Sequence, residues 1–265
     1  MIISRTPYRL SFFGGGTDYP SWYLKHEGQV LSTTIDKYIY ITCRNLPPFF
    51  DHKIRLVYSK MEIGKNSSDI KHPSAREVLK FLNIKDGLEI HYDGDLPGRS
   101  GSGSSSAFTV GLLNALYAYK GEIVSSKDLA DQSIHIEQNI IKETVGSQDQ
   151  TSAAFGGLNH IIFEKSGDIK VKPITISYDL LKELQNNLLL FYTGIQRTAE
   201  EVAKSYAINI EDNSNVLNKF SSMVDESIKI LKNKDFDNFG RLLNEAWKEK
   251  RSLSNIVSNS KIDSI

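Results

Sequence analysis

A cluster of glycine and serine residues leads directly into a patterned helix, and this arrangement limits the fold more than any other feature of the chain. The cluster is LPGRSGSGSSSA at 96–107, and apolar side chains recur at helical spacing over 108–119. Glycines let successive backbone N–H groups point into one concavity, and the helix N-terminus adds its positive dipole end. The segment therefore predicts a phosphate-binding loop between a strand and a helix.

Two other interpretations of this loop are weaker. A flexible glycine-serine linker does not run directly into a strongly patterned helix. A Walker A loop needs a lysine, which the segment lacks, and the protein-kinase signatures do not occur in the chain.

The surrounding sequence predicts an α+β fold. Segments rich in β-branched and aromatic residues predict strands at 28–43, 88–92, 158–163, 169–176 and 188–192. A helix is expected from Ser125, whose pairing with Asp128 resembles a capping box, to about residue 142. After residue 199 only helical stripes remain, and because few later strands follow, we expect these helices to lack a sheet to pack on. A soft domain boundary falls near residue 175.

Glu137 lies within the apolar face of that helix. Ala130, Ile134, Glu137 and Ile141 fall at i, i+4, i+7 and i+11. A buried unpaired charge is strongly unfavourable, so a cation or an arginine is expected beside it. Magnesium bound to nucleotide phosphates would satisfy the carboxylate, and from the spacing alone an ordinary buried salt bridge is an equally good explanation.

Asp149 lies in a polar turn that we expect directly after the helix, at 144–150. A loop aspartate is usually a cap or a turn residue. Its position matters because a phosphoryl-transfer enzyme needs a carboxylate that orients or deprotonates the accepting hydroxyl, in addition to a phosphate cradle and a metal ligand.

Composition argues against several kinds of partner. Lys plus Arg and Asp plus Glu number 32 each, so no net field favours nucleic acid or an anionic membrane. No apolar stretch approaches the roughly 20 residues that span a bilayer, and the N-terminus does not resemble a signal peptide, so we expect a cytoplasmic protein. Cys43 is the single cysteine, which excludes an internal disulfide, and its place in an alternating apolar run predicts burial.

Together with RTPYRLSFFGGGTDYP at 5–20, these pieces resemble the GHMP kinases, named for galactokinase, homoserine kinase, mevalonate kinase and phosphomevalonate kinase. Residues 5–20 resemble the substrate motif of that family. Residues 97–107 resemble its ATP motif, Pro-x-x-x-Gly-Leu-Gly-Ser-Ser-Ala, with Ser102 in the place of the leucine. Within the family, SFFGGGTDYPSWY, VLSTTIDKY, VGSQDQTSAAFGG and FYTGIQR are most similar to segments of D-glycero-D-manno-heptose 7-phosphate kinases.

The resemblance implies a two-domain α+β architecture, with a ribosomal protein S5 domain 2-like domain over 1–175 and a ferredoxin-like domain over 176–265. It implies that ATP, with Mg²⁺, phosphorylates the anomeric hydroxyl of the heptose 7-phosphate. Asp149 would be the catalytic base, and Arg9 would hold its carboxylate ionised. Ser105 and Glu137 would bind the magnesium ion, with the register of the serine open by one residue.

The resemblance also assigns residues to the two substrates. The expected ATP contacts are Pro97, Gly98, Arg99, Ser100, Gly101, Ser102, Gly103, Ser104, Ser105 and Ser106. The expected sugar contacts are Gly15, Gly16, Thr17, Asp18, Gly194 and Arg197. Arg197 would bind the distal phosphate, although an exposed arginine at a helix start is the alternative there. The implied partners are ATP and a sugar phosphate, and a homodimer is possible.

The sequence departs from the family pattern after residue 200. The third motif of the family, a glycine-rich strand and turn, is absent, and Gly240 is the last glycine. We therefore expect a truncated C-terminal domain. Two alternatives stay open: a GHMP kinase for another sugar such as fucose, and a non-catalytic protein that binds a sugar phosphate or a nucleotide. The presence of Asp149, Glu137, Arg9 and Asp18 together favours an enzyme.

Overall fold

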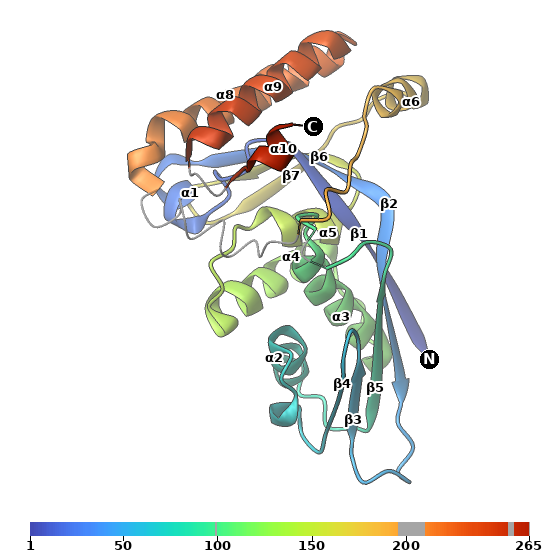
Figure 1. Cartoon of the computed structure of the whole chain (residues 1–265). Helices are drawn as coiled ribbons and strands as arrows, with labels where there is room; N and C mark the ends of the chain where they lie inside the picture. The colour runs from blue at the N-terminus through green and yellow to red at the C-terminus, as the bar shows by residue number, and fades with distance from the viewer. Residues whose placement is uncertain (99, 196–209, 254–256, 265) are drawn as a thin grey trace. The chain divides into compact units, whose positions relative to one another are not determined.

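The computed structural model describes residues 1–98, 100–195, 210–253 and 257–264, and it confirms the α+β class (Figure 1). The chain divides into two compact units, and each is built from three separate stretches. Unit 1 comprises 1–9, 34–143 and 149–156, and unit 2 comprises 10–33, 144–148 and 157–265. The two units are defined by contacts within the chain and not by the bounds of a family domain. The predicted domain boundary near residue 175 therefore stays a prediction.

Unit 1 contains a sheet with helices on one side. Its elements are the start of β1 (Ile2–Phe13), most of β2 (Gly28–Asn45), β3 (Ile54–Val57), β4 (Met61–Gly64), the 3₁₀ turn η1 (Ser67–Asp69), α2 (Pro73–Phe81), β5 (Leu88–Gly94), α3 (Ser104–Lys120), α4 (Ser126–Ile134), the π-helix η2 (His135–Ile141) and most of α5 (Gln148–Phe155). The strand order here is β4-β3-β5-β2, with β1 also pairing with β2. The predicted strand at 88–92 and the predicted N-cap at Ser125 are confirmed.

The core of unit 1 lies between the sheet and its helices. Alternate residues of β2 and β5, such as Ile41 and Ile90, pack with Leu112 and Leu116 of α3. Cys43 belongs to the same cluster, and burial raises the pKa of its thiol to about 12. The glycine-serine loop therefore ends where α3 is held rigidly on the sheet.

One buried carboxylate joins three strands of this sheet. Glu89 of β5 forms ion pairs with Arg44 of β2 and Arg55 of β3, and its Oε1 lies 2.7 Å from Nε2 of His91. The hydrogen bond from Arg55 is the main reason that the pKa of Glu89 falls to about 2. Glu89 lies between Leu88 and Ile90, which both enter the core, so its own side chain faces the opposite side of the strand.

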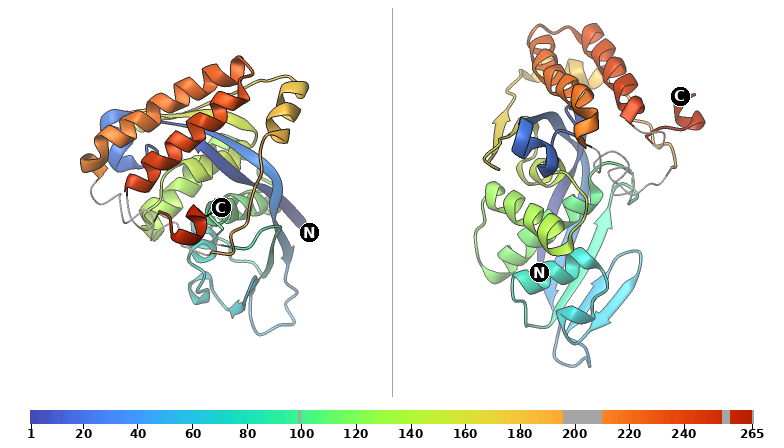
Figure 2. Two further views of the ribbon diagram at one scale, coloured as in Figure 1. Left: turned by 45° about the horizontal axis from the view of Figure 1, so that its top comes forward. Right: turned by 90° about the vertical axis from the view of Figure 1, so that its left-hand side faces the viewer.

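Unit 2 contains the remaining strands and the later helices. Its elements are the end of β1, α1 (Pro20–His26), the start of β2, the first residue of α5, β6 (Leu158–Phe163), β7 (Ile169–Pro173), α6 (Tyr178–Asn186), the 3₁₀ turn η3 (Ile210–Asn213), α8 (Ser214–Lys232), α9 (Phe236–Leu253) and α10 (Ser260–Asp263). The strand order is β2-β6-β7, all antiparallel. Figure 2 shows α8 and α9 side by side, and Lys219 of α8 pairs with Glu249 of α9.

The expectation that the late helices lack a sheet to pack on is wrong. Phe220 and Val224 of α8 lie in one buried cluster with Phe13 of β1, Leu31 of β2 and Ile161 of β6. All three strands precede α8 in the sequence, β1 and β2 by a long way, so a search for strands after residue 199 could not find these partners. The apolar stripe therefore has its partner within unit 2.

The predicted strand at 188–192 is also wrong. Residues 188–195 have no regular secondary structure, and α6 precedes them. The side chains of Leu189, Leu190, Phe191 and Tyr192 are between 55% and 83% exposed, so β propensity alone did not make a strand here. Among the described residues, no helix is both long and apolar enough to cross a membrane.

Candidate functional site

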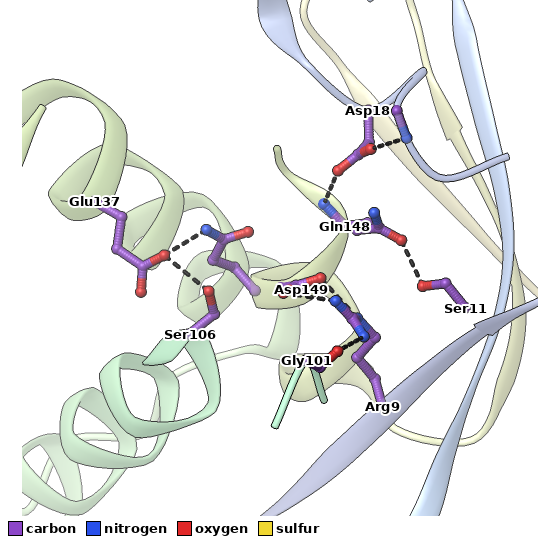
Figure 3. Close-up of polar contacts among 10 residues, drawn as sticks. Arg9, Ser11, Asp18, Gly101, Ser106, Glu137, Gln148 and Asp149 are labelled. Atoms are coloured by element: carbon purple, nitrogen blue, oxygen red, sulfur yellow. Dashed lines mark hydrogen bonds and ion pairs between the residues drawn. The ribbon is translucent and has the colours of Figure 1, made fainter. Parts of the chain in front are cut away.

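Arg9 and Asp149 form a two-pronged ion pair in unit 1 (Figure 3). Arg9 Nε donates to Asp149 Oδ1 at 2.7 Å, and Arg9 Nη2 donates to Asp149 Oδ2 at 2.9 Å. Asp149 lies in the first turn of α5 and not in the polar turn that the sequence predicted. The planar guanidinium fixes the orientation of the carboxylate. The side chains are 16% and 21% exposed, so the carboxylate keeps a route to a ligand.

The same arginine holds the glycine-serine loop. Arg9 Nη1 donates to the carbonyl of Gly101 at 2.8 Å, and the backbone N–H of Arg9 donates to the carbonyl of Ser102 at 3.2 Å. Gly101 and Gly103 have φ angles of 79° and 76°, which side chains rarely adopt. No side chain of the described residues caps the N-terminus of α3, so its first N–H groups can bind an anion. These features fit the predicted phosphate loop.

Glu137 is fully buried in the π-helix η2 that continues α4. Its Oε2 accepts hydrogen bonds from Ser106 Oγ at 2.8 Å and from Gln150 Nε2 at 2.5 Å (Figure 3). Burial raises the pKa of Glu137 to about 7. No basic side chain in the described part of the chain pairs with this carboxylate, so the ordinary salt bridge is not the explanation. A π-helix widens a helix locally and often occurs at functional positions.

Two buried oxygens beside Glu137 have no hydrogen-bond partner. They are Glu137 Oε1 and Gln150 Oε1, which have no partner among the described residues; the amide oxygen only accepts, and so does the carboxylate oxygen when Glu137 is ionised. Unpartnered oxygen acceptors suit a hard divalent cation such as Mg²⁺, which completes its shell with phosphate oxygens and water. The residues therefore fit a magnesium ion. The serine that reaches Glu137 is Ser106, whereas Ser105, the predicted ligand, is exposed and makes no bond to Glu137.

Asp18 organises a second group of residues, in unit 2. Its side chain is 1% exposed, and its two oxygens accept the N–H groups of Gly16 at 2.9 Å and of Gln148 at 3.2 Å (Figure 3). A Cβ on Gly146 would lie 1.8 Å from Asp18 Oδ2, so only glycine fits there. Thr17 Oγ1 donates to the carbonyl of Gly14 at 2.9 Å. Asp18 thus fixes the glycine-rich turn, and a direct bond to a sugar stays a prediction.

Gly15 faces polar groups that the sequence did not indicate. A Cβ at Gly15 would lie 3.5 Å from Gln148 Nε2 and 3.8 Å from Lys250 Nζ. Ser11 Oγ donates to Gln148 Oε1 at 2.5 Å, which orients the amide. Lys250 belongs to the last turn of α9, more than two hundred residues from the turn that it approaches.

Three other predicted site residues, Arg99, Arg197 and Gly194, are not placed in either group of contacts. Arg99 and Arg197 lie outside the described residues. Gly194 has a φ angle of 73° in an exposed segment of unit 2 without regular structure, and nothing lies within 4 Å of its Cβ position. Gln150, Gln148 and Lys250 were missed as site residues, since a single glutamine or lysine has no sequence signature. The VGSQDQT segment was the one available signal for the two glutamines.

The chain is similar to several known proteins. Residues 71–157 match the family described as GHMP kinases N terminal domain. The chain is 28% identical over 276 residues to the D-glycero-alpha-D-manno-heptose 7-phosphate kinase of Campylobacter jejuni, covering all of this chain and 81% of that one. It is 23% identical over 305 residues to the L-fucokinase/L-fucose-1-P guanylyltransferase of Bacteroides fragilis, covering all of this chain and 32% of that one.

A solved structure shares the fold. The D-glycero-D-manno-heptose 1-phosphate kinase of Bacteroides thetaiotaomicron superposes with a TM-score of 0.79 at 22% identity, covering 95% of this chain and 79% of that one. The phosphate loop, Glu137 and Asp149 all fall within the matched residues 71–157.

Proposed function

Because the chain carries a GHMP kinase N-terminal domain, we propose that it is an ATP-dependent sugar kinase, and that its acceptor is D-glycero-D-manno-heptose 7-phosphate. The observation that carries the proposal is the Arg9–Asp149 pair beside the glycine-serine loop in unit 1. It combines a phosphate cradle with a carboxylate that can accept a proton, as phosphoryl transfer to a hydroxyl requires.

The choice of acceptor rests on the relatives. The names of the Campylobacter and Bacteroides thetaiotaomicron proteins both contain a D-glycero-D-manno-heptose and a phosphate, although the position of the phosphate differs between them. The proposed reaction converts ATP and the 7-phosphate into ADP, the 1,7-bisphosphate and a proton. The relation to an L-fucokinase makes fucose the second candidate acceptor.

Each residue has a separate task in this reaction. The N–H groups at the start of α3 and the backbone of 100–103 bind the phosphates of ATP. Asp149 accepts the proton of the anomeric hydroxyl, and the two hydrogen bonds from Arg9 hold that carboxylate in position. Glu137, with Ser106 or Ser105 and Gln150 Oε1, would hold Mg²⁺, which offsets the negative charge of the phosphates when bound.

The test is ATP consumption with free and 7-phosphorylated heptose, fucose, galactose and mevalonate. We expect turnover with heptose 7-phosphate, and a loss of about 10²- to 10⁴-fold in kcat for Asp149→Asn. Asp168→Asn, which alters an exposed turn of unit 2, is the matched control and should keep full activity. Turnover with fucose alone would reassign the acceptor, and nucleotide or sugar binding without turnover would favour the non-catalytic alternative.

The cytoplasm is the location that we propose, since the donor is ATP. A homodimer remains a prediction, to be checked by light scattering of the purified protein.

A further inference from the structure

Two neighbouring residues of β1 hold the glycine-serine loop at its two ends. Arg9 binds the carbonyls of Gly101 and Ser102, where the loop leads into α3 (Figure 3). Tyr8 Oη donates to the carbonyl of Leu96 at 3.1 Å, where the loop begins. Both residues of β1 and the loop belong to unit 1. The segment that would bind phosphate therefore lies between two points of contact with the same strand.

The hydroxyl of Tyr8 reaches the loop because residue 94 has no side chain. A Cβ on Gly94 would lie 2.7 Å from Tyr8 Oη and 3.1 Å from Tyr92 Oη. Gly94 does not have a positive φ angle, so the close approach of the hydroxyls, and not backbone strain, requires a glycine here. Burial is the main cause that raises the pKa of Tyr8 well above its ordinary value, so the hydroxyl keeps its proton and stays a donor at neutral pH.

The start of the loop is also restricted in other ways. The side chain of Leu96 packs against the core of unit 1, and Pro97 favours an extended backbone at Leu96. The bond from Tyr8 adds a polar contact from within the core, where Tyr8 is fully buried. A loop that already has its binding conformation loses less conformational freedom when a ligand arrives, so its affinity is higher.

We propose that Tyr8 is a positioning residue for ATP: through the carbonyl of Leu96, it holds the glycine-serine loop in the conformation that binds the phosphates. The inference rests on the proposed function and deepens it, because it names a residue that preforms the binding site of the donor. Since Tyr8 is fully buried, it acts through the loop and not by contact with ATP.

The experiment compares Tyr8→Phe with wild type in steady-state kinetics. The Michaelis constant for ATP should rise about 5- to 20-fold, because the loop loses one hydrogen bond that holds it. The value of kcat and the Michaelis constant for the acceptor sugar should change less than about threefold, since Arg9 and Asp149 keep their contacts. An unchanged constant for ATP, or an equal rise for ATP and the sugar, would overturn the inference.

The matched control is Tyr117→Phe. This variant also removes a tyrosine hydroxyl of unit 1, which donates to Gln132 Oε1 at 2.8 Å between α3 and α4. Its Michaelis constant for ATP should equal that of wild type. Urea titrations measure the loss of stability in both variants. A rise in the constant for ATP in both variants, in proportion to that loss, would show that Tyr8 has only a structural role.

A second pair of variants tests the space at Gly94. Gly94→Ala should displace the hydroxyl of Tyr8 and raise the Michaelis constant for ATP as Tyr8→Phe does. Gly87→Ala crowds the opposite end of β5, where a Cβ would lie 2.6 Å from the carbonyl oxygen of Leu46, and should leave that constant unchanged. Equal constants in these two variants would contradict the inference.

The inference and the proposed function fail differently. If wild type turns over none of the sugars, the proposed function is wrong, and the inference is decided by calorimetric titration with ATP in the presence of Mg²⁺. Binding that is weakened in Tyr8→Phe and kept in Tyr117→Phe supports the role of Tyr8. Equal binding by both variants, or no binding by wild type, contradicts it.

Discussion

Gly103 shows how closely single residues are fitted around Asp149. A Cβ there would lie 3.2 Å from Arg9 Cγ and 3.3 Å from Asp149 Oδ2, whereas a Cβ on Gly101 would meet nothing within 4 Å. Both glycines have the left-handed φ angle that costs other residues roughly 1–2 kcal/mol. The two glycines therefore form a matched pair. Both have the same type of strained backbone, but only a side chain at position 103 would meet Arg9 and Asp149.

Gly103→Ala and Gly101→Ala should each lower the free energy of unfolding by about 1 kcal/mol in urea. Only Gly103→Ala should also lower kcat, by about tenfold or more beyond Gly101→Ala, because it displaces the Arg9–Asp149 pair. Equal kcat values for the two variants would show that the contact with Asp149 is unimportant.

Glu137 makes the free energy of unfolding depend on pH, and the direction of this dependence follows from its raised pKa. The carboxyl titrates at about 7 in the folded protein against 4.5 as the ordinary value, mainly because of burial. The folded state holds the proton more tightly, so this group contributes most stability below about pH 4.5, and that contribution is lost as the pH rises towards 7.

In metal-free buffer, Glu137→Gln should flatten the fall in unfolding free energy between pH 5 and 8. At pH 8 the variant should exceed wild type by on the order of 3 kcal/mol, because the buried charge is absent. Urea titrations with a chelator, at four pH values, measure both curves. Parallel curves would mean that Glu137 does not titrate in this range.

The sequence indicated some members of the candidate site and missed others. Asp149, Arg9 and Glu137 stand in motifs or in an apolar stripe, and the structure brings Asp149 to Arg9 and buries Glu137. Lys250 could not be predicted, because nothing in one chain distinguishes it from an ordinary surface lysine, and the VGSQDQT segment was the one signal for Gln150. Their roles depend on contacts that only the fold creates.

At the scale of elements, Glu89 ties β2, β3 and β5 together. Removal of a buried carboxylate between two arginines leaves two positive charges facing each other. For a fully buried ion pair, the loss of one partner lowers the free energy of unfolding by roughly 3–5 kcal/mol. Arg44 is 45% exposed, so solvent screens part of the effect.

Glu89→Gln should lower the free energy of unfolding by about 2 kcal/mol at pH 7, measured in urea. Glu164→Gln, which removes the partner of the exposed Lys170, should change it by less than about 0.5 kcal/mol. A similarly small loss of unfolding free energy in both variants would show that the ion pairs of Glu89 contribute no more than an exposed surface pair.

Elements with strong local signals were predicted well, and elements that depend on distant partners were not. The strand at 158–163 and the helix that follows the glycine-serine loop agree with the structure. The run at 188–192 has the composition of a strand. A strand also needs a neighbouring strand with free hydrogen-bonding groups, and composition gives no information on that partner. The π-helix at 135–141 has no sequence signature either.

At the scale of the whole molecule, the compact units do not follow the order of the chain. The core of unit 2 contains Phe13 and Leu31 from the start of the sequence and Phe220 from near its end. The overall α+β class was visible in the pattern of segments, whereas this pairing of early strands with late helices was not, since periodicity carries no information on distant partners.

A fragment of residues 1–175 should therefore expose the apolar surface of β1, β2 and β6 that α8 and α9 cover. We expect it to bind a hydrophobic dye strongly and to lack the near-ultraviolet circular dichroism of the full chain. A fragment with a cooperative urea transition and no dye binding would show that residues 1–175 fold alone.

The interleaved units also have a consequence for synthesis on the ribosome. Phe13 and Leu31 emerge early, but their partners on α8 emerge almost two hundred residues later. At roughly 5–20 residues per second, this gap is of the order of ten seconds or more, during which part of the nascent chain keeps apolar strands uncovered. Chaperones that bind nascent chains have their longest opportunity at residues 10–33.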